Sequence, residues 1–544
     1  MTITASKLIR GLMFMVFTLH RYIFREVFRV FVLSTAALVL MMSLGIILRP
    51  VQQYGVGPKQ VLHLMGYFLP ITLTFVLPIA ALFATSLTYG RLASDNEIDA
   101  CRASGINLLT LVYPGLALAV MVAIANLLLS FHVMPAFFRR AEKSLKADAK
   151  QILFRNIQRR GFYRPPDAEY IIYADRANPN NDILSGVVVA ESKDEKIERI
   201  VTAETAQVNF IPHQKTNEVQ IVAHRTYQAD SEGIWYFELL PITKEFPSLL
   251  RDDIKFKKID EIKKIHADMI RFYPVEKLAR QVYARLTAEI LQQDIAGKIA
   301  SSEESSYRLH SADKIIDLNA ADCRVSADKR LELSGSVTVT EYSNAQQPAR
   351  TLQCDKAYIY IEGDEFAPTL TLVLNNPSWQ QPDASLRLAQ RVIIRGLIIP
   401  KSITDKFVST DILQTLSPES IDRALDGQTS EKLKALDDNL DKSLRKTLAE
   451  INAEIHSRLV FGIGCVPLTL IGIGLGIILK GGHLLTAFGA SSIPAAALIV
   501  CIMAGRNITK NLGARAGSGI IIMWLALVLL FILTLFIYRR LLKN

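Results

Sequence analysis

Charged residues are missing from several long stretches of this sequence, although 21% of its 544 residues are charged overall. No Asp, Glu, Lys or Arg occurs among the 31 residues between Lys59 and Arg91, or among the 36 between Arg102 and Arg139. About 20 apolar residues in an α-helix are enough to span the hydrocarbon core of a bilayer. The missing charge therefore indicates an integral membrane protein.

Six such stretches predict six transmembrane helices, because a backbone inside lipid must satisfy its own hydrogen bonds. Three precede and three follow a polar middle region of 320 residues. The first is not expected to be a cleaved signal peptide, since its apolar run is too long and no small-residue cleavage site follows it. The six are Val30–Leu48, part of Gln60–Gly90, part of Ala103–Phe138, Leu459–Leu479, part of Gly481–Gly505 and part of Ala516–Tyr538.

The motifs of common catalytic sites are also missing. The sequence has no Walker A loop, no His-Glu-x-x-His motif and no Gly-x-Ser-x-Gly elbow, and no two of its nine histidines stand at metal-ligand spacing. We therefore expect no enzyme, no metal site and no cofactor on this chain. The net charge of +10 is modest and lies mostly beside the membrane stretches, which favours anionic lipid over nucleic acid as a partner.

Cysteine is scarce, with five residues in the whole sequence. Cys323 and Cys354 lie in the polar middle region, where a disulfide is chemically permitted if that region is outside the cell membrane. Free thiols are the alternative, because sequence separation does not fix the geometry that a disulfide requires.

The distribution of Lys and Arg predicts the orientation in the membrane, since these residues favour the cytoplasmic side. Both ends of the chain are basic, and six spans place both ends on the same side. We therefore expect both termini in the cytoplasm and the middle region outside. The basic residues are Lys7, Arg10, Arg21, Arg25 and Arg29 near the first stretch, and Arg539, Arg540 and Lys543 after the last.

The middle region predicts two β-rich parts joined by a helix. Segments such as "EYIIYADR" and "LSGVVVAES" alternate in polarity, and several of them at intervals of about ten residues are typical of a sandwich or jelly roll. The two β-rich parts contain a similar pair of segments. The first part has "SGVVV" at Ser185 followed by "AETAQV", and the second has "SGSVTV" at Ser334 followed by "CDKAYI". The similarity is due either to duplication or to chance. The predicted parts are a β-jelly roll at 139–270, a helical connector at 271–300, a second jelly-roll-like insertion at 301–400 and a helical return segment at 401–458; membrane helices occupy 1–138 and 459–544.

A short charged segment, "RLASDNEIDACRASGIN", separates the second and third membrane stretches. Ser94 and Glu97 have the spacing of a capping box, and Gly105 is a typical helix stop, so we predict a surface helix over residues 94–105. Its charges are either simply solvated or belong to a docking helix for a cytoplasmic partner. The residues of the docking interpretation are Ser94, Asp95, Glu97, Ile98, Asp99, Arg102 and Gly105.

Two segments, "HRYIFREVFRVF" and "FVLPIAALFATSLTYGRLASDNEIDACRASGIN", resemble the LptF/LptG family, the permease subunits of the lipopolysaccharide export ABC transporter. The resemblance implies an α-helical membrane protein of the inner membrane, with six spans divided three and three by a periplasmic β-jelly roll. It also implies that the helix at 94–105 is the coupling helix that contacts the ATPase. Glu97-Ile98 and Ala103-Ser104-Gly105 match the family pattern at that contact.

The family resemblance also implies partners: a cytoplasmic ABC ATPase dimer that uses the ATP, a homologous permease half, periplasmic jelly-roll bridge proteins, and lipopolysaccharide or a related glycolipid. The chain is longer than is usual in the family, with the excess between about Ala300 and Lys434. "LELSGSVTVTEY" and "TLQCDKAYIYIEG" in this excess are similar to jelly-roll repeats of other lipopolysaccharide transport components, which predicts the second jelly roll.

Basic residues at the outer membrane surface are candidate ligands for lipid phosphate. Arg49 resembles in position a residue that binds lipid phosphate in the family, and Lys59 is a weaker candidate. Arg506 and Lys510 lie on the predicted outer side with no acidic residue in their loop, which is typical of a phosphate site. The alternative for each is a side chain that merely reaches the membrane surface.

These patterns together predict a permease half that extracts lipopolysaccharide from the inner membrane and passes it to a periplasmic bridge. The alternative is a membrane-anchored scaffold that presents a periplasmic β-domain without transport. Charge reversal at Glu97 distinguishes the two, since only the permease needs the ATPase contact.

Overall fold

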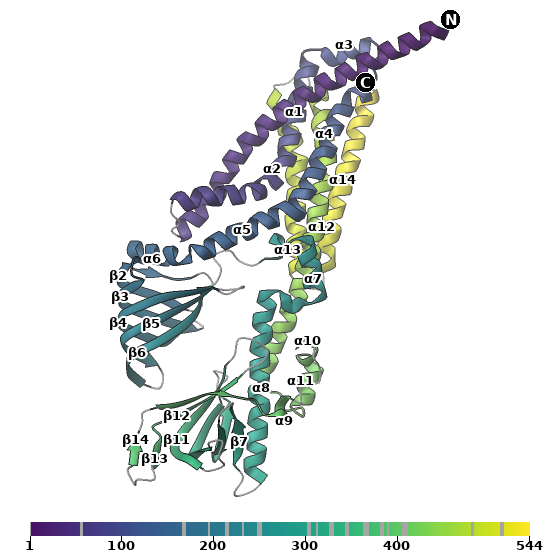
Figure 1. Cartoon of the computed structure of the whole chain (residues 1–544). Helices are drawn as coiled ribbons and strands as arrows, with labels where there is room; N and C mark the ends of the chain where they lie inside the picture. The colour runs from purple at the N-terminus through teal and green to yellow at the C-terminus, as the bar shows by residue number, and fades with distance from the viewer. Residues whose placement is uncertain are drawn as a thin grey trace. The chain divides into compact units, whose positions relative to one another are not determined.

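The helices and strands form two compact units in the computed structural model of the chain (Figure 1). The membrane unit comprises Met1–Lys263 and Leu448–Asn544, and the second unit comprises Lys264–Thr447. The structure describes residues 2–54, 58–165, 170–193, 196–212, 217–230, 233–246, 253–301, 306–311, 314–325, 331–342, 348–362, 369–380, 386–388, 391–404, 412–479, 484–511 and 516–543.

Six helices of the described chain are long and apolar enough to cross a membrane, which confirms the predicted number of spans. They extend well beyond the charge-free stretches, because charged residues end the apolar surface without ending the helix. Both chain termini lie at the end of the bundle where α3 (Glu97–Ala103) is found (Figure 1). The six are α1 (Thr2–Tyr54), α2 (Pro58–Ser94), α4 (Leu108–Leu128) with its continuation, α12 (Glu431–Ile478), α13 (Leu484–Lys510) and α14 (Ala516–Lys543).

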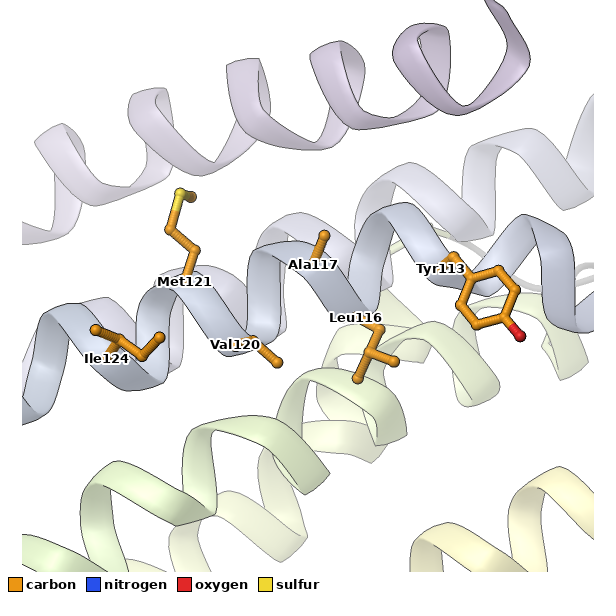
Figure 2. Close-up of a pocket in the computed structure, with 6 residues that line it drawn as sticks. All are labelled: Tyr113, Leu116, Ala117, Val120, Met121 and Ile124. Carbon is orange, nitrogen blue, oxygen red and sulfur yellow. The ribbon is translucent and has the colours of Figure 1, made fainter. Parts of the chain in front are cut away.

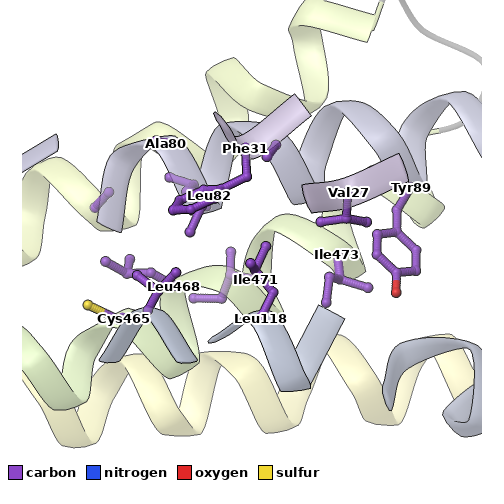
Figure 3. Packing of buried hydrophobic residues seen from close by; sticks show 14 of the residues in the cluster. Val27, Phe31, Ala80, Leu82, Tyr89, Leu118, Cys465, Leu468, Ile471 and Ile473 are labelled. Carbon is purple, nitrogen blue, oxygen red and sulfur yellow. The ribbon is translucent and has the colours of Figure 1, made fainter. Parts of the chain in front are cut away.

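The third span continues from α4 through a π-helical turn, η1 (Leu129–Val133), into α5 (Met134–Ala147). Side chains from α1, α2, α4 and α12 meet in the core of the bundle, among them Val27, Leu82, Leu118 and Ile471 (Figure 3). Because lipid is as apolar as these side chains, close packing must hold the helices together. At Gly476, an added Cβ would lie 2.8 Å from the carbonyl oxygen of Ser86, so α2 and α12 approach within backbone contact.

The β-strands of the membrane unit form one six-stranded antiparallel sheet, here called sheet A, whose strands follow one another in sequence order. One face packs against α5 and α6 (Ala149–Arg160), with Ile152 and Leu153 meeting Val189 and Ile221. The predicted strands are confirmed and their pairing is antiparallel, whereas their closure into a jelly roll stays a prediction. The strands are β1 (Phe162–Tyr163), β2 (Tyr170–Asn178), β3 (Ile183–Lys193), β4 (Lys196–Pro212), β5 (Asn217–Asp230) and β6 (Gly233–Phe246).

Three short helices follow sheet A: η2 (Ile254–Phe256), α7 (Ile259–Ala267) and η3 (Met269–Arg271). The second unit then combines α8 (Tyr273–Ser301), in the region predicted as a helical connector, with a nine-stranded antiparallel sheet B. The strands are β7 (Tyr307–His310), β8 (Ile315–Asn319), β9 (Asp322–Val325), β10 (Leu331–Tyr342), β11 (Pro348–Glu362), β12 (Thr369–Asn375), β13 (Ser378–Gln380), β14 (Leu386–Leu388) and β15 (Arg391–Leu397).

Sheet B has the order β14-β13-β11-β10-β8-β7, with β9 also beside β10 and β12 joining β11 to β15. This confirms strands in the insertion but not a jelly roll. The helices α9 (Lys401–Thr404), α10 (Ile412–Thr415) and α11 (Pro418–Ala424) lead into α12, which runs without a break from the predicted return segment into the fourth span. A buried ion pair on α8, Arg285 with Glu289 at 2.6 Å, helps to fix that helix next to Ser430, whose hydroxyl contacts Glu289.

The disulfide between Cys323 and Cys354 is not formed, and both residues are free thiols. Cys323 on β9 pairs with Leu333 of β10, whereas Cys354 on β11 pairs with Val337 from the other side of that strand. Two strand spacings of about 4.8 Å separate their backbones, which is more than a disulfide can bridge. Burial raises the pKa of the Cys323 thiol to about 12 and that of Cys354 to about 11, so neither forms a reactive thiolate at neutral pH.

Candidate functional site

The charged segment after the second span folds as a turn and the short helix α3, and its beginning differs from the prediction. α2 continues through Ser94, and α3 begins only at Glu97. The residue before α3 is Asn96, in a left-handed conformation with φ of 58° and without a side-chain cap. The predicted capping box between Ser94 and Glu97 is therefore wrong, because Ser94 still belongs to the preceding helix.

The end of α3 agrees with the prediction. Gly105 has a φ of +81°, a conformation that glycine adopts at little cost. The Gly105 amide donates to the carbonyl of Arg102 at 2.9 Å, and the Ile106 amide donates to that of Cys101 at 3.0 Å. These two bonds form a Schellman motif, which satisfies the last carbonyls of α3 and turns the chain into α4.

One side of α3 is anchored and the other is exposed. Ile98 is buried in the core of the bundle, and Cys101 packs partly against the same core. Glu97 and Arg102 on the helix and Asp95 in the turn before it are exposed, so this segment presents charges of both signs to its surroundings. A seven-residue helix has little stability alone, and the buried Ile98 and the Schellman turn therefore hold this charged surface in place.

Two polar contacts tie the surroundings of α3 to α1. Arg91, near the end of α2, forms a 3.0 Å ion pair with Glu26 of α1. The Tyr22 hydroxyl, also on α1, hydrogen-bonds the Glu97 side chain. Sequence reasoning missed both contacts. The available signal was Glu26 itself, the one acidic residue among the basic residues at the start of α1.

The family model of the lipopolysaccharide export system permease LptF/LptG matches residues 21–300 and 282–540. These two segments together cover nearly the whole chain, including α3, both sheets and the six membrane helices. The chain belongs to the LptF/LptG family. No curated protein sequence matches it at a significant level.

Membership in the LptF/LptG family confirms the resemblance seen in the sequence and extends it. Members of this family are transmembrane permeases of lipopolysaccharide export and not enzymes, so the chain is a transport protein. The two matched segments overlap at residues 282–300, within α8. The match thus also includes the insertion between about Ala300 and Lys434, by which the chain exceeds the usual length of the family.

The basic residues proposed for lipid phosphate are arranged differently from the prediction. Arg506 and Lys510 do have acidic partners: Arg506 pairs with Glu454 at 2.6 Å, and Lys510 with Glu450 at 3.5 Å. The expectation that both lack such partners is wrong, because the acids come from α12, more than 50 residues earlier in the sequence. The side chains of Arg49 and Lys59 lie outside the described residues.

Glu454, which lies on α12 just before its apolar part, is the centre of a buried ionic cluster. It also pairs with Arg458 at 2.9 Å, and the two side chains are 7% and 3% exposed. Arg458 donates to the carbonyl of Lys255 at 2.8 Å and lies over the ring of Phe131. The cluster thus joins α12 to α13, to η1 and to the segment that follows sheet A.

A shallow groove of about 630 Å³ runs along α4 (Figure 2). Ala117 and Met121 point toward α1, whereas Leu116 and Val120 point toward α12 (Figure 2). A polar ligand needs a few well-placed polar groups for orientation. The side chains that line this groove are apolar except for the Tyr113 hydroxyl, so it is suited to lipid chains rather than to a headgroup.

Proposed function

We propose that this chain is one permease half of an ABC transporter that extracts lipopolysaccharide, or a similar glycolipid, from the inner membrane. A homologous permease half completes the membrane part, and a cytoplasmic ATPase dimer hydrolyses the ATP, so this chain needs no cofactor. The glycolipid is then passed to periplasmic jelly-roll bridge proteins. In this arrangement both termini and α3 are cytoplasmic, and both sheets are periplasmic.

The observation that carries this proposal is the construction of α3. Its apolar side is fixed in the bundle by Ile98, and its exposed side carries Glu97 and Arg102, with exposed Asp95 in the turn before it. A rigid charged surface at a membrane boundary is suited to bind a partner that transmits its conformational change to the membrane helices. Tyr22 and the ion pair between Arg91 and Glu26 connect this surface to α1, so a force on α3 reaches two membrane helices.

The lipid phosphates require basic residues at the opposite end of the bundle. Arg49 and Lys59 stay candidates for this role. Arg506 and Lys510 become available only if phosphate displaces Glu454 and Glu450, since these acids hold them in the present structure. Arginine offers phosphate two parallel hydrogen bonds, which favours Arg506 in such a competition.

Reversal of the charge at Glu97 tests the proposal. Glu97→Arg should reduce co-purification of the ATPase at least tenfold and abolish export, because it places a cation against a surface that accepts an anion. The measurement is the yield of ATP-binding subunit recovered with the tagged chain in detergent. Glu97→Gln keeps a hydrogen-bond acceptor for Tyr22 and separates loss of charge from loss of local structure.

Glu419→Arg is a matched control, because Glu419 is also exposed in the first turn of a seven-residue helix, α11. This variant should keep the ATPase bound. If Glu97→Arg also keeps the ATPase and export, the coupling role is wrong. A chain that never co-purifies with an ATPase would support the scaffold alternative.

A further inference from the structure

Sheet A contains a row of residues at which the strand ladder is interrupted on every strand from β2 to β6. The pairing of β2 with β3 passes from Ala174–Val187 to Arg176–Ser185 and omits one residue on each strand. The next three strand pairs omit one residue at the same level. The omitted residues form a continuous row: Asp175, Gly186, Glu204, Arg225 and Glu238.

The row adds a residue to the outer face of each strand without shifting the register. Inward side chains normally recur every second residue of a strand. At this level they recur at the third residue, so two consecutive residues between them face away from the α6-covered side. The inward pairs are Ala174 and Ala177, Leu184 and Val187, Ala203 and Ala206, and Ala223 and Thr226.

The backbone of the row is unusual at Gly186 and Arg225, which have φ angles of 62° and 50°. At Gly186 the Asp175 carboxyl occupies the space of a Cβ, with its Cγ atom 2.7 Å from that position. Arginine in the left-handed region costs free energy, and such residues concentrate where the strain serves a function. The 2.9 Å ion pair of Arg225 with Glu204 is too exposed to repay this cost.

The row borders a shallow groove of about 500 Å³ on the outer face. Tyr227 and Tyr236 line it with their rings 5.1 Å apart, and they are 56% and 50% exposed. The Tyr236 hydroxyl donates to Glu238 at 2.6 Å, which orients its ring. The groove therefore presents aromatic faces beside the charged groups of Asp175, Glu204 and Arg225.

We propose that this groove on the outer face of sheet A binds the saccharide part of the exported glycolipid. Carboxylate and guanidinium groups are planar and can bond two neighbouring sugar hydroxyls at once, and tyrosine rings offer a flat apolar surface to the C–H face of a pyranose. The two carboxylates and one guanidinium disfavour a phosphate. Arg225, between Glu204 and Glu238 in the row, disfavours a cationic peptide.

The claim that this saccharide is part of the exported glycolipid rests on the proposed export function. Binding of a saccharide to the groove does not. It can be measured on the full-length protein in detergent with lipopolysaccharide oligosaccharide freed of its lipid. Saturation-transfer NMR should detect binding with a dissociation constant of about 1 mM or lower. No ATPase is needed, so this result and the Glu97 experiment can fail separately.

Three substitutions locate the site. Tyr227→Ala and Tyr236→Ala should each weaken binding at least tenfold. Arg225→Asn should weaken it similarly while leaving the melting temperature unchanged or higher, because asparagine tolerates the left-handed conformation better than arginine. Tyr173→Ala is the matched control: Tyr173 is an exposed tyrosine of the same sheet but does not line the groove, and its loss should not change binding.

Any one of the following results would overturn the proposal. One is an absence of saturable oligosaccharide binding at concentrations up to about 10 mM, or binding that all three groove variants retain. Another is saturable binding of a lysine-rich peptide in place of the oligosaccharide, which would make the groove an acidic protein-docking site. A lower melting temperature of Arg225→Asn would also count against it, since the arginine would then be structural.

Discussion

Replacement of Gly519 by alanine should strongly destabilise the packing of α13 against α14. A Cβ at position 519 would overlap the carbonyl oxygen of Gly505 and the Thr509 hydroxyl, and it would lie 2.9 Å from the Thr509 amide nitrogen. Two of these atoms belong to a helix backbone, so they cannot move aside as a flexible side chain can. Overpacking of this kind costs about 3 kcal/mol or more when the backbone must shift.

Gly517→Ala is the control for this prediction, because it adds the same methyl group two residues earlier in α14. Among the residues that the structure describes, no heavy atom lies within 4 Å of a Cβ at Gly517, and alanine favours a helix over glycine by about 1 kcal/mol. Thermal unfolding in detergent should therefore show a lower melting temperature for Gly519→Ala and an equal or higher one for Gly517→Ala. Equal melting temperatures for both variants would refute the close contact between α13 and α14.

The membrane helices could be predicted because the absence of charge over about 20 residues is a property of composition alone. Their ends could not be predicted in the same way. Arg21, Arg25 and Arg29 mark where α1 leaves the apolar region, yet arginine is a good helix former and the helix begins at Thr2. Charge therefore locates the membrane boundary, whereas capping residues and turns locate the helix end.

The short helix α3 shows how a local pattern can be overridden. Ser94 and Glu97 have capping-box spacing, but the last turn of α2 includes Ser94, since Leu92 and Ala93 are buried and keep that helix packed against the bundle. Gly105 was correctly predicted as the stop because its φ requirement depends on the chain alone. Packing decides the start of α3, and local backbone chemistry decides its end.

The row in sheet A was visible in the sequence only in part. The segment "AETAQV" places Ala203 and Ala206 three residues apart, both buried, and the same three-residue step recurs in the neighbouring strands. A related irregularity occurs in sheet B, where Gly335 and Ser336 have φ angles of 81° and 54°. The similarity predicted between the two strand regions thus extends to backbone geometry, although register could not be predicted without cross-strand partners.

The acidic partners of Arg506 and Lys510 could not be predicted from the residues near them in the sequence. Glu450, Glu454 and Arg458 stand four residues apart on α12, directly before its apolar part. An acid beside a membrane segment needs a counter-charge, because burial of an unpaired charge is costly. That spacing indicated a charged stripe on α12, but only the packing of α13 shows which cations it meets.

Replacement of Glu454 by leucine should be the most damaging change in this ionic cluster. Arg458 is only 3% exposed, so loss of Glu454 leaves a buried guanidinium that retains backbone carbonyls but no anion. Removal of one partner from a buried pair costs about 3–5 kcal/mol. Glu450→Leu should cost about 1 kcal/mol, because its 3.5 Å pair with Lys510 is more exposed.

The double variant Glu454→Leu with Arg458→Met should recover most of the lost stability, because a buried ion pair can often be replaced by apolar residues of similar size. Arg506 is 26% exposed and can reach solvent without its partner. Melting temperatures of the single and double variants in the same detergent measure this difference. If Glu454→Leu melts like the unmodified protein, another anion, such as a lipid phosphate, must neutralise Arg458 and Arg506. Removal of lipid should then lower its melting temperature selectively.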